Sequence, residues 1–286
     1  MYDDGKGMPR DDAQAALWYR KAAEQGYPQA QYHLGLLYNV GQGVPKDDVE
    51  AALWYNKAAE QGEADAQTLL GMLYDTGSGV PQDRTQALAW CRKADDQGNG
   101  SARDCLYMLY TGEMDRGETA DYPEAVAWFR KTANQGYDLA QDVLGNLYYD
   151  GQGVPQDYTQ AALWWRKAAE QGDARAQDSF GDLYYHGQGV PQDYARAALW
   201  YRKSAEQGNA KAQFVLGALY HGGMGVPKDD AEAYFWFDLA AAAKDNSVAK
   251  EAAKVRDAIA FILAPADLSS AQERARKWSE EHQAKP

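Results

Sequence analysis

The residue types that most often carry chemistry are few in this sequence, and their spacing does not fit a reactive site. The four histidines, His33, His186, His221 and His282, show no metal-ligand spacing with one another or with the two cysteines, so no metal site is expected. The glycines of the recurring Gly-x-Gly-Val-Pro segments lack the preceding strand that a phosphate-binding loop requires. We therefore expect neither a bound cofactor nor a catalytic centre.

A row of arginines is the most promising set of functional residues. These residues stand at one recurring position, two residues after a tryptophan: Arg20, Arg92, Arg130, Arg166 and Arg202. A guanidinium group can bind a carboxylate with two hydrogen bonds, so the row predicts a surface for an acidic peptide or a C-terminal carboxylate. Tyr122, Tyr158 and Tyr194 lie shortly before the same tryptophans and would add contact area. The alternative is that the arginines pair with nearby Asp and Glu on a solvated face.

The elements that carry this row are internal repeats. Trp18, Trp54, Trp90, Trp128, Trp164, Trp200 and Trp236 are spaced by 36, 36, 38, 36, 36 and 36 residues. Around each lies the pattern D-x-x-x-A-x-x-W-[YFW]-x-K-A-A-E-Q-G-x-x-x-A-Q-x-x-L-G-x-L-Y, with some departures. A fixed period of this length is typical of solenoids, in which stacked units bury a continuous core. The tryptophans, and Trp165 beside Trp164, are therefore expected to be core residues.

Each unit is predicted to be a helical hairpin. In the second repeat, Asp47 follows Pro45 at the position of an N-cap, and Glu50 completes the spacing of a capping box. The same spacing recurs in the other repeats except where Arg196 replaces the Glu or Gln. A second helix is expected to start near Asp65, and its interior Gly71 predicts close approach of a large ring or a packed helix. No segment shows the two-residue alternation of a strand.

Composition excludes several partner classes. The chain has 286 residues, a net charge of −13 and 45% hydrophobic residues, so it can bury a large core. An acidic protein lacks the basic face that nucleic-acid binding requires, so no nucleic-acid partner is expected. No segment approaches the length of apolar sequence that spans a bilayer, so no membrane insertion is expected either.

The repeat pattern resembles that of the Sel-1-like repeat family, relatives of the tetratricopeptide repeats, over residues 1 to about 263. The resemblance implies an all-α, right-handed superhelix of about seven antiparallel helix hairpins that serves as a protein-interaction scaffold. It also implies a bacterial periplasmic or secreted location, while a cytoplasmic one stays open. We expect a remnant of a preceding repeat at 1–4, repeats at 5–40, 41–76, 77–111, 112–150, 151–186, 187–222 and 223–263, and a capping helix and tail at 264–286. Ser270 and Glu273 have the spacing of a capping box at the start of that helix.

Departures from the pattern cluster between residues 91 and 122. Tyr107 replaces the glycine of the second helix, and a segment longer by two residues replaces the Gly-Val-Pro loop. Degeneration of a repeat and a specialised binding site both explain these changes, and Tyr107 is kept as a candidate contact residue. Cys91 and Cys105 lie on the two helices of this hairpin. An antiparallel pair brings such residues near the distance of a disulfide, but two buried thiols are the favoured expectation.

Three functions are consistent with these observations. The leading hypothesis is a non-enzymatic scaffold that binds a protein or peptide along the inner surface of the solenoid, as a monomer. The second is an inhibitor or immunity-type protein that neutralises one effector enzyme. The third is a hydrolase of cell-wall amides or β-lactams, supported only by the Ser-x-x-Lys spacing of Ser247 and Lys250, which lacks the accompanying S-D-N and K-T-G motifs.

Overall fold

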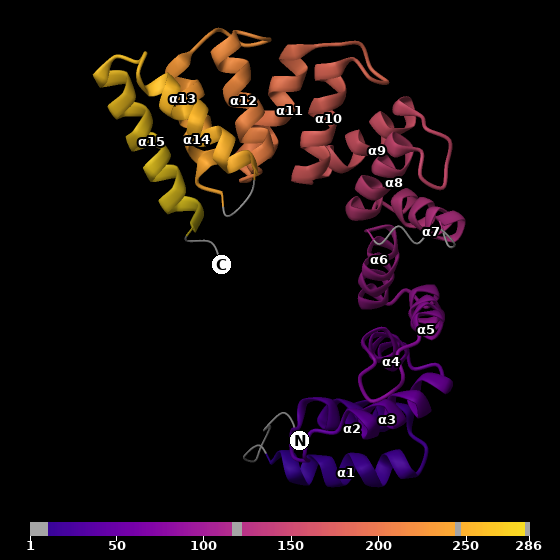
Figure 1. Cartoon of the computed structure of the whole chain (residues 1–286). Coiled ribbons are helices and arrows are strands. Elements are labelled where there is room, and N and C mark those ends of the chain that lie inside the picture. The colour runs from indigo at the N-terminus through magenta and orange to yellow at the C-terminus, as the bar shows by residue number, and fades with distance from the viewer. Residues whose placement is uncertain (1–10, 116–121, 244–246, 284–286) are drawn as a thin grey trace. The chain divides into compact units, whose positions relative to one another are not determined.

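The computed structural model describes residues 11–115, 122–243 and 247–283, which form fifteen helices and no strand (Figure 1). The helices are α1 (Asp12–Glu24), α2 (Pro28–Val40), α3 (Asp48–Glu60), α4 (Ala64–Thr76), α5 (Arg84–Asp96), α6 (Gly100–Asp115), α7 (Tyr122–Asn134), α8 (Asp138–Asp150), α9 (Tyr158–Gln171), α10 (Ala174–His186), α11 (Tyr194–Glu206), α12 (Ala210–Gly222), α13 (Asp230–Ala241), α14 (Ser247–Ala260) and α15 (Pro265–Gln283). The all-α repeat architecture predicted from the period is confirmed.

The chain divides into two compact units, residues 1–119 and 120–286. The described helices of the first unit, α1 to α6, form three hairpins, and α7 to α14 form four hairpins in the second unit, where α15 packs against α13. From α1 to α6 and from α7 to α14, each helix contacts the next one along the chain, which is the nearest-neighbour stacking of a solenoid. The division between the units falls in the irregular segment that the sequence singled out.

The capping aspartates act as predicted. Asp47 accepts hydrogen bonds from the backbone N–H groups of Val49 and Glu50 at 3.0 and 3.1 Å. Asp193 caps α11 in the same way although its partner three residues later is Arg196. The expected start of the last helix is corrected, because α15 begins at Pro265 and so includes Ser270 in its interior. Proline at the first helical position needs no N–H partner, which explains the earlier start.

The tryptophan column is mostly core, as expected. Trp164 and Trp165 are 6% and 4% exposed, so neither is an open platform for a ligand. In four repeats, the ammonium group of the lysine three residues later lies 3.9–4.2 Å from the centre of the indole: Lys57 on Trp54, Lys93 on Trp90, Lys167 on Trp164 and Lys203 on Trp200. These cation–π contacts cover the edge of the column toward solvent. Trp18 departs from the pattern, with 54% of its surface exposed.

The interior glycines leave room for the ring that follows each tryptophan. A Cβ atom added at Gly145 would lie 2.4 Å from the indole of Trp165, and one at Gly35 would lie 2.6 Å from the ring of Tyr55. Gly181 and Gly217 face Tyr201 and Phe237 in the same register. The predicted close approach is confirmed, and at Gly71 the close group is the Cys91 sulfur.

A ladder of buried glutamines joins successive hairpins. In each case, the glutamine of the Ala-Gln motif donates to an alanine carbonyl at the end of the preceding helix: Gln31 to Ala23, Gln67 to Ala59, Gln141 to Ala133, Gln177 to Ala169 and Gln213 to Ala205. The glutamine of the next Gln-Gly motif then donates to the side-chain oxygen of that residue: Gln61 to Gln31, Gln97 to Gln67, Gln171 to Gln141 and Gln207 to Gln177, at 2.7–2.8 Å. The two motifs are therefore partners across the repeat boundary.

Cys91 and Cys105 form a disulfide bond between α5 and α6. The expectation of two separate buried thiols is therefore corrected. The antiparallel packing of the two helices places the Cα atoms 6.3 Å apart, inside the range that a disulfide spans.

Candidate functional site

Four arginines of the predicted row bind a tyrosine hydroxyl within their own hairpin. Arg92 donates to Tyr110 at 2.8 and 3.0 Å, and Arg130 donates to Tyr148 at 2.9 Å. Arg20 bonds Tyr38 and Arg202 bonds Tyr220 in the same way, each 18 residues further along the chain. We call this contact the Arg–Tyr clamp, because it joins the two helices of one hairpin.

The seventh hairpin keeps the clamp with other residues. Asp238 stands where the other hairpins carry arginine, and Arg256 stands 18 residues later. Their side chains form an ion pair at 3.0 Å. The repeated position therefore has a structural role, and neither of the two interpretations made from the sequence anticipated tyrosine as the main partner.

Arg166 is the exception in the row. Its guanidinium makes an exposed ion pair with Glu170 at 3.6 Å, within its own helix α9. Such a surface pair contributes little free energy, so Arg166 stays available to another partner. The hydroxyl of Tyr184, the partner expected from the 18-residue spacing, takes part in no hydrogen bond within the described part of the chain.

In this fully described hairpin no hydrogen bond joins Arg166 to Tyr184, and we call this arrangement the open clamp. Two departures from the repeat account for it. Phe180 stands in the row otherwise held by Leu34, Leu70, Leu106, Leu144 and Leu216, and its ring lies 5.0 Å from that of Tyr184. Arg196, which breaks the capping-box spacing, places its guanidinium carbon 5.6 Å from the centre of the Tyr184 ring. The tyrosine is thus held by an aromatic contact and a cation–π contact. In the four hairpins with a closed clamp, the tyrosine is held by the arginine of its own hairpin.

The open clamp forms a pocket of about 280 Å³ between α9 and α10. Arg166, Tyr184 and Phe180 line it together with Thr159, Gln160 and other residues of the hairpin. Its walls offer a cation, hydroxyl and amide groups and an aromatic surface. This combination suits a ligand that carries a carboxylate next to apolar atoms. We call this the Arg166 pocket.

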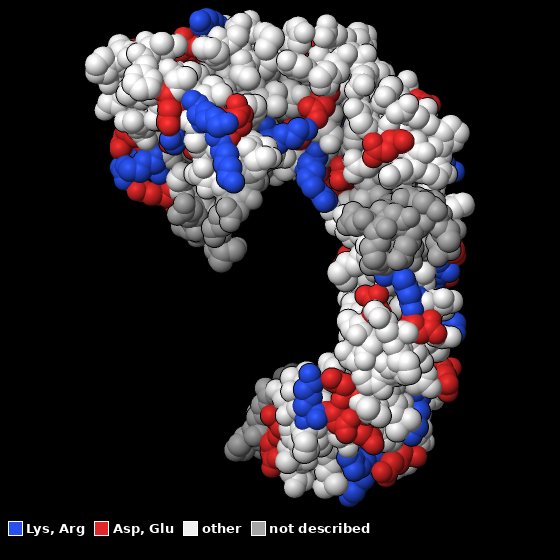
Figure 2. Space-filling model, in the orientation of Figure 1, with Lys and Arg blue, Asp and Glu red and all other residues white. Residues whose placement is uncertain are grey.

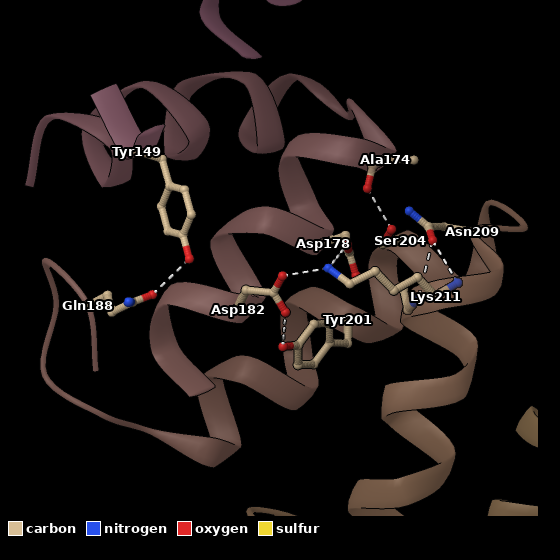
Figure 3. Close-up of polar contacts among 10 residues, drawn as sticks. Tyr149, Ala174, Asp178, Asp182, Gln188, Tyr201, Ser204, Asn209 and Lys211 are labelled. Carbon is tan, nitrogen blue, oxygen red and sulfur yellow. Dashed lines mark hydrogen bonds and ion pairs between the residues drawn. The ribbon is translucent and has the colours of Figure 1, made fainter. Parts of the chain in front are cut away.

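A charged cluster lies on α10 and α12 of the second unit (Figure 3). The ammonium group of Lys211 lies 3.0 Å from Asp178 and 2.6 Å from Asp182. Tyr201 donates its hydroxyl proton to Asp182 at 2.6 Å. On the face shown in Figure 2, acidic and basic side chains of this unit lie next to one another in the same manner. The cluster joins the fifth hairpin to the sixth, and its charged groups pair mainly with one another.

Three positions of this cluster also carry charged or aromatic residues one repeat earlier. Asp142 on α8, Trp165 on α9 and Arg175 on α10 correspond to Asp178, Tyr201 and Lys211. Arg175 approaches Asp142 at 3.7 Å, while the second carboxylate oxygen of Asp142 is buried and makes no hydrogen bond of normal geometry. Burial and the nearby charge of Asp173 raise the pKa of Asp142 to about 6, although Arg175 opposes this rise. Burial also raises the pKa of Asp178.

The other predicted contact residues are placed as follows. Tyr158 and Tyr194 are half-buried, and their rings lie 5.2 Å from those of Tyr149 and Tyr185. Tyr107 is half-buried on α6. The side chain of Tyr122 lies outside the described residues. The structure thus brings Arg166 together with Tyr184, Phe180 and Arg196, of which only Arg166 was predicted as a contact residue.

The motif proposed for a hydrolase has no supporting geometry. Ser247 and Lys250 are exposed on α14, and no hydrogen bond joins them. Among the described residues, no cluster of histidine, cysteine or acidic side chains is arranged to hold a metal ion. No described helix has the length and apolar character required to cross a membrane.

Comparison with known proteins places these repeats in context. The family model of the Sel1 repeat matches residues 1–27, 28–63, 64–99, 101–137, 138–173, 174–209 and 210–245. The crystal structure of a Sel1 repeat protein from Oxalobacter formigenes is 33% identical, with 82% of this chain and 99% of that chain covered and a TM-score of 0.55. No curated protein sequence matched the chain.

Two further structures have a lower structural similarity. One is that of c5321, a protective antigen of uropathogenic Escherichia coli with an SLR fold, which is 28% identical over 98% of this chain and 82% of that chain, with a TM-score of 0.49. The other is immunity protein Pa5087 from Pseudomonas aeruginosa, which is 25% identical over 82% of this chain and 84% of that chain, with a TM-score of 0.39.

Proposed function

The chain belongs to the Sel1 repeat family, and from this premise we propose that it is a non-catalytic scaffold that binds an acidic segment of a partner protein in the Arg166 pocket. Sel1 repeats typically mediate protein–protein interactions. The proposal names the part of this chain that supplies the contact and the chemistry of the partner. Of the five arginines predicted as contact residues, the proposal keeps only Arg166.

The open Arg–Tyr clamp is the observation that carries the proposal. Arg20, Arg92, Arg130 and Arg202 each bind a tyrosine, which fixes the guanidinium and leaves a partner only the remaining N–H groups. Arg166 is not held by a tyrosine, and its contact with Glu170 is a weak, solvent-exposed ion pair. Binding at Arg166 therefore loses less free energy to the rearrangement of the protein than binding at the other four.

The groups around the pocket favour a carboxylate. Arg166 and Tyr184 both line the pocket and can both donate hydrogen bonds to one anionic group. Arg196 places a second guanidinium near the Tyr184 ring, where it also forms an exposed ion pair with Asp193 at 3.3 Å. The rings of Phe180 and Tyr184 would contact the apolar part of the same segment.

Selection from a peptide library tests the proposal. A displayed library of random peptides with free carboxyl termini is panned against the full chain, and we expect enrichment of peptides with Asp, Glu or a terminal carboxylate at a fixed position. Arg166→Glu should weaken their binding by at least about tenfold, since it replaces the cation with a like charge. The matched control is Lys250→Glu, which makes the same charge change at an exposed lysine of α14.

The outcomes separate clearly. Loss of binding in Arg166→Glu with retention in Lys250→Glu supports the Arg166 pocket as the anchor. Equal affinity of the two variants would refute it, as would a selection dominated by basic peptides.

A further inference from the structure

The glutamine ladder is incomplete at its last step. Gln213 is 2% exposed and donates to the carbonyl of Ala205, as its counterparts do in four other hairpins; the third hairpin has Arg103 at this position. In four earlier cases the side-chain oxygen of the corresponding glutamine accepts a hydrogen bond from the next Gln-Gly motif. Ala243 stands where that motif would place the next glutamine, 36 residues after Gln207. The Gln213 oxygen therefore has no donor among the described residues.

A pocket of about 580 Å³ occupies the place of the missing side chain. Gln213 lines it together with Ala243, Ala242 and Leu239 of the seventh hairpin. Trp278 of α15 also lines it, and its indole stacks on the His282 ring with centroids 3.8 Å apart. The pocket thus combines the side chain of a buried residue, Gln213, with apolar and aromatic walls, which is the usual composition of a ligand site.

We propose that this pocket binds the side-chain carboxamide of a glutamine from a partner peptide, which donates to Gln213 and takes the place of the missing ladder residue. The same chain contains the bound arrangement four times, as an intramolecular Gln–Gln hydrogen bond of 2.7–2.8 Å. A ligand that supplies an N–H group would give the Gln213 oxygen the donor that the corresponding oxygens have in the four earlier cases. The methylene groups of a glutamine would lie against Leu239 and Trp278.

The acceptor also defines what the pocket rejects. A glutamate side chain has no N–H group at neutral pH and would approach Glu206, which lies at the pocket wall. A norleucine side chain fills a similar volume but leaves the Gln213 oxygen without a donor. This site is separate from the Arg166 pocket and does not depend on the proposed function.

Nuclear magnetic resonance with three small probes tests the inference. Trp278 is identified by the loss of its indole N–H signal in Trp278→Phe, and the full chain is titrated with N-acetyl-glutamine methylamide. A saturable shift of the Trp278 signal is expected, with an affinity at least about tenfold higher than for the glutamate and norleucine analogues. No saturable shift, or equal shifts with the norleucine analogue, would overturn the proposal.

The variant Ala243→Gln supplies a second, independent test. It restores the repeat residue, so its own carboxamide should fill the pocket, raise the midpoint of thermal unfolding and abolish binding of the glutamine probe. The matched control is Ala243→Met, which has a similar length without a donor and should give a smaller rise. Equal midpoints for the two variants, or full probe binding by Ala243→Gln, would contradict the assignment.

Discussion

At the scale of single residues, the aromatic that follows the tryptophan in four repeats is explained by the glycine that faces it. Trp165 fills the space that Gly145 leaves open, and Tyr55 and Phe237 use Gly35 and Gly217 in the same way. The sequence predicted a close approach at these glycines because glycine in a helix interior lowers stability by itself. It could not predict which ring would lie there, since that depends on how successive hairpins pack.

Replacing Gly145 with alanine should therefore weaken the fold. The new Cβ would lie 2.4 Å from the Trp165 indole, and relieving that overlap is expected to lower the free energy of unfolding by roughly 1–3 kcal/mol. Chemical denaturation measures this change. Gly100→Ala is the control, since no atom lies within 4 Å of an added Cβ there and its stability should stay the same or rise slightly. Equal effects of the two substitutions would contradict the packing described.

The buried carboxyl of Asp142 predicts a pH effect on stability. Its pKa in the folded chain is about 6, above the value near 4 that an unfolded chain has. The folded state therefore binds the proton more tightly. This contribution to stability is full below about pH 4 and is lost as the pH rises through 6, and it amounts to at most about 3 kcal/mol.

Asp142→Asn removes the ionisation and should raise the melting temperature above pH 6. Stability of the wild-type chain should fall between pH 4 and pH 7, and the fall should be smaller in the variant. Thermal unfolding over this pH range provides the measurement. Parallel pH profiles for the two proteins would show that Asp142 is not the group responsible.

At the scale of elements, the helix starts were predicted better than the contacts between helices. The aspartate caps follow from local spacing, and the structure confirms them at Asp47 and Asp193. The Arg–Tyr clamp joins residues 18 positions apart on two helices, so its geometry appears only when the hairpin is folded. For the same reason, the open clamp at Arg166 could not be predicted, although Phe180 and Arg196 were visible as departures from the repeat.

The clamp should contribute to the stability of a hairpin only where it is closed. Tyr148→Phe removes the hydroxyl that accepts from Arg130, and the free energy of unfolding should fall by about 0.5–1.5 kcal/mol. Tyr184→Phe removes a hydroxyl without a partner among the described residues and should leave stability unchanged. Denaturant unfolding of both variants checks the difference. A loss as large in Tyr184→Phe as in Tyr148→Phe would refute the distinction.

At the scale of the whole molecule, repetition explains both the fold and the location of the candidate sites. Stacked hairpins bury most of the tryptophan column and join their buried glutamines through hydrogen bonds that recur from repeat to repeat. Both proposed sites lie where a repeated hydrogen-bond contact is interrupted, at Arg166 and at Gln213. In a protein with a net charge of −13, the arginines near Tyr184 are a local exception that would attract an acidic segment.

Restoring the interrupted clamp is the most direct test of this account. The double substitution Phe180→Leu and Arg196→Gln returns both positions to residues found at the same place in other repeats, so Tyr184 becomes free to accept from Arg166. We expect the variant to fold with equal or greater stability and to bind the selected acidic peptides at least about tenfold more weakly in isothermal titration. Unchanged peptide affinity in a well-folded variant would contradict the claim that the open clamp is the binding site.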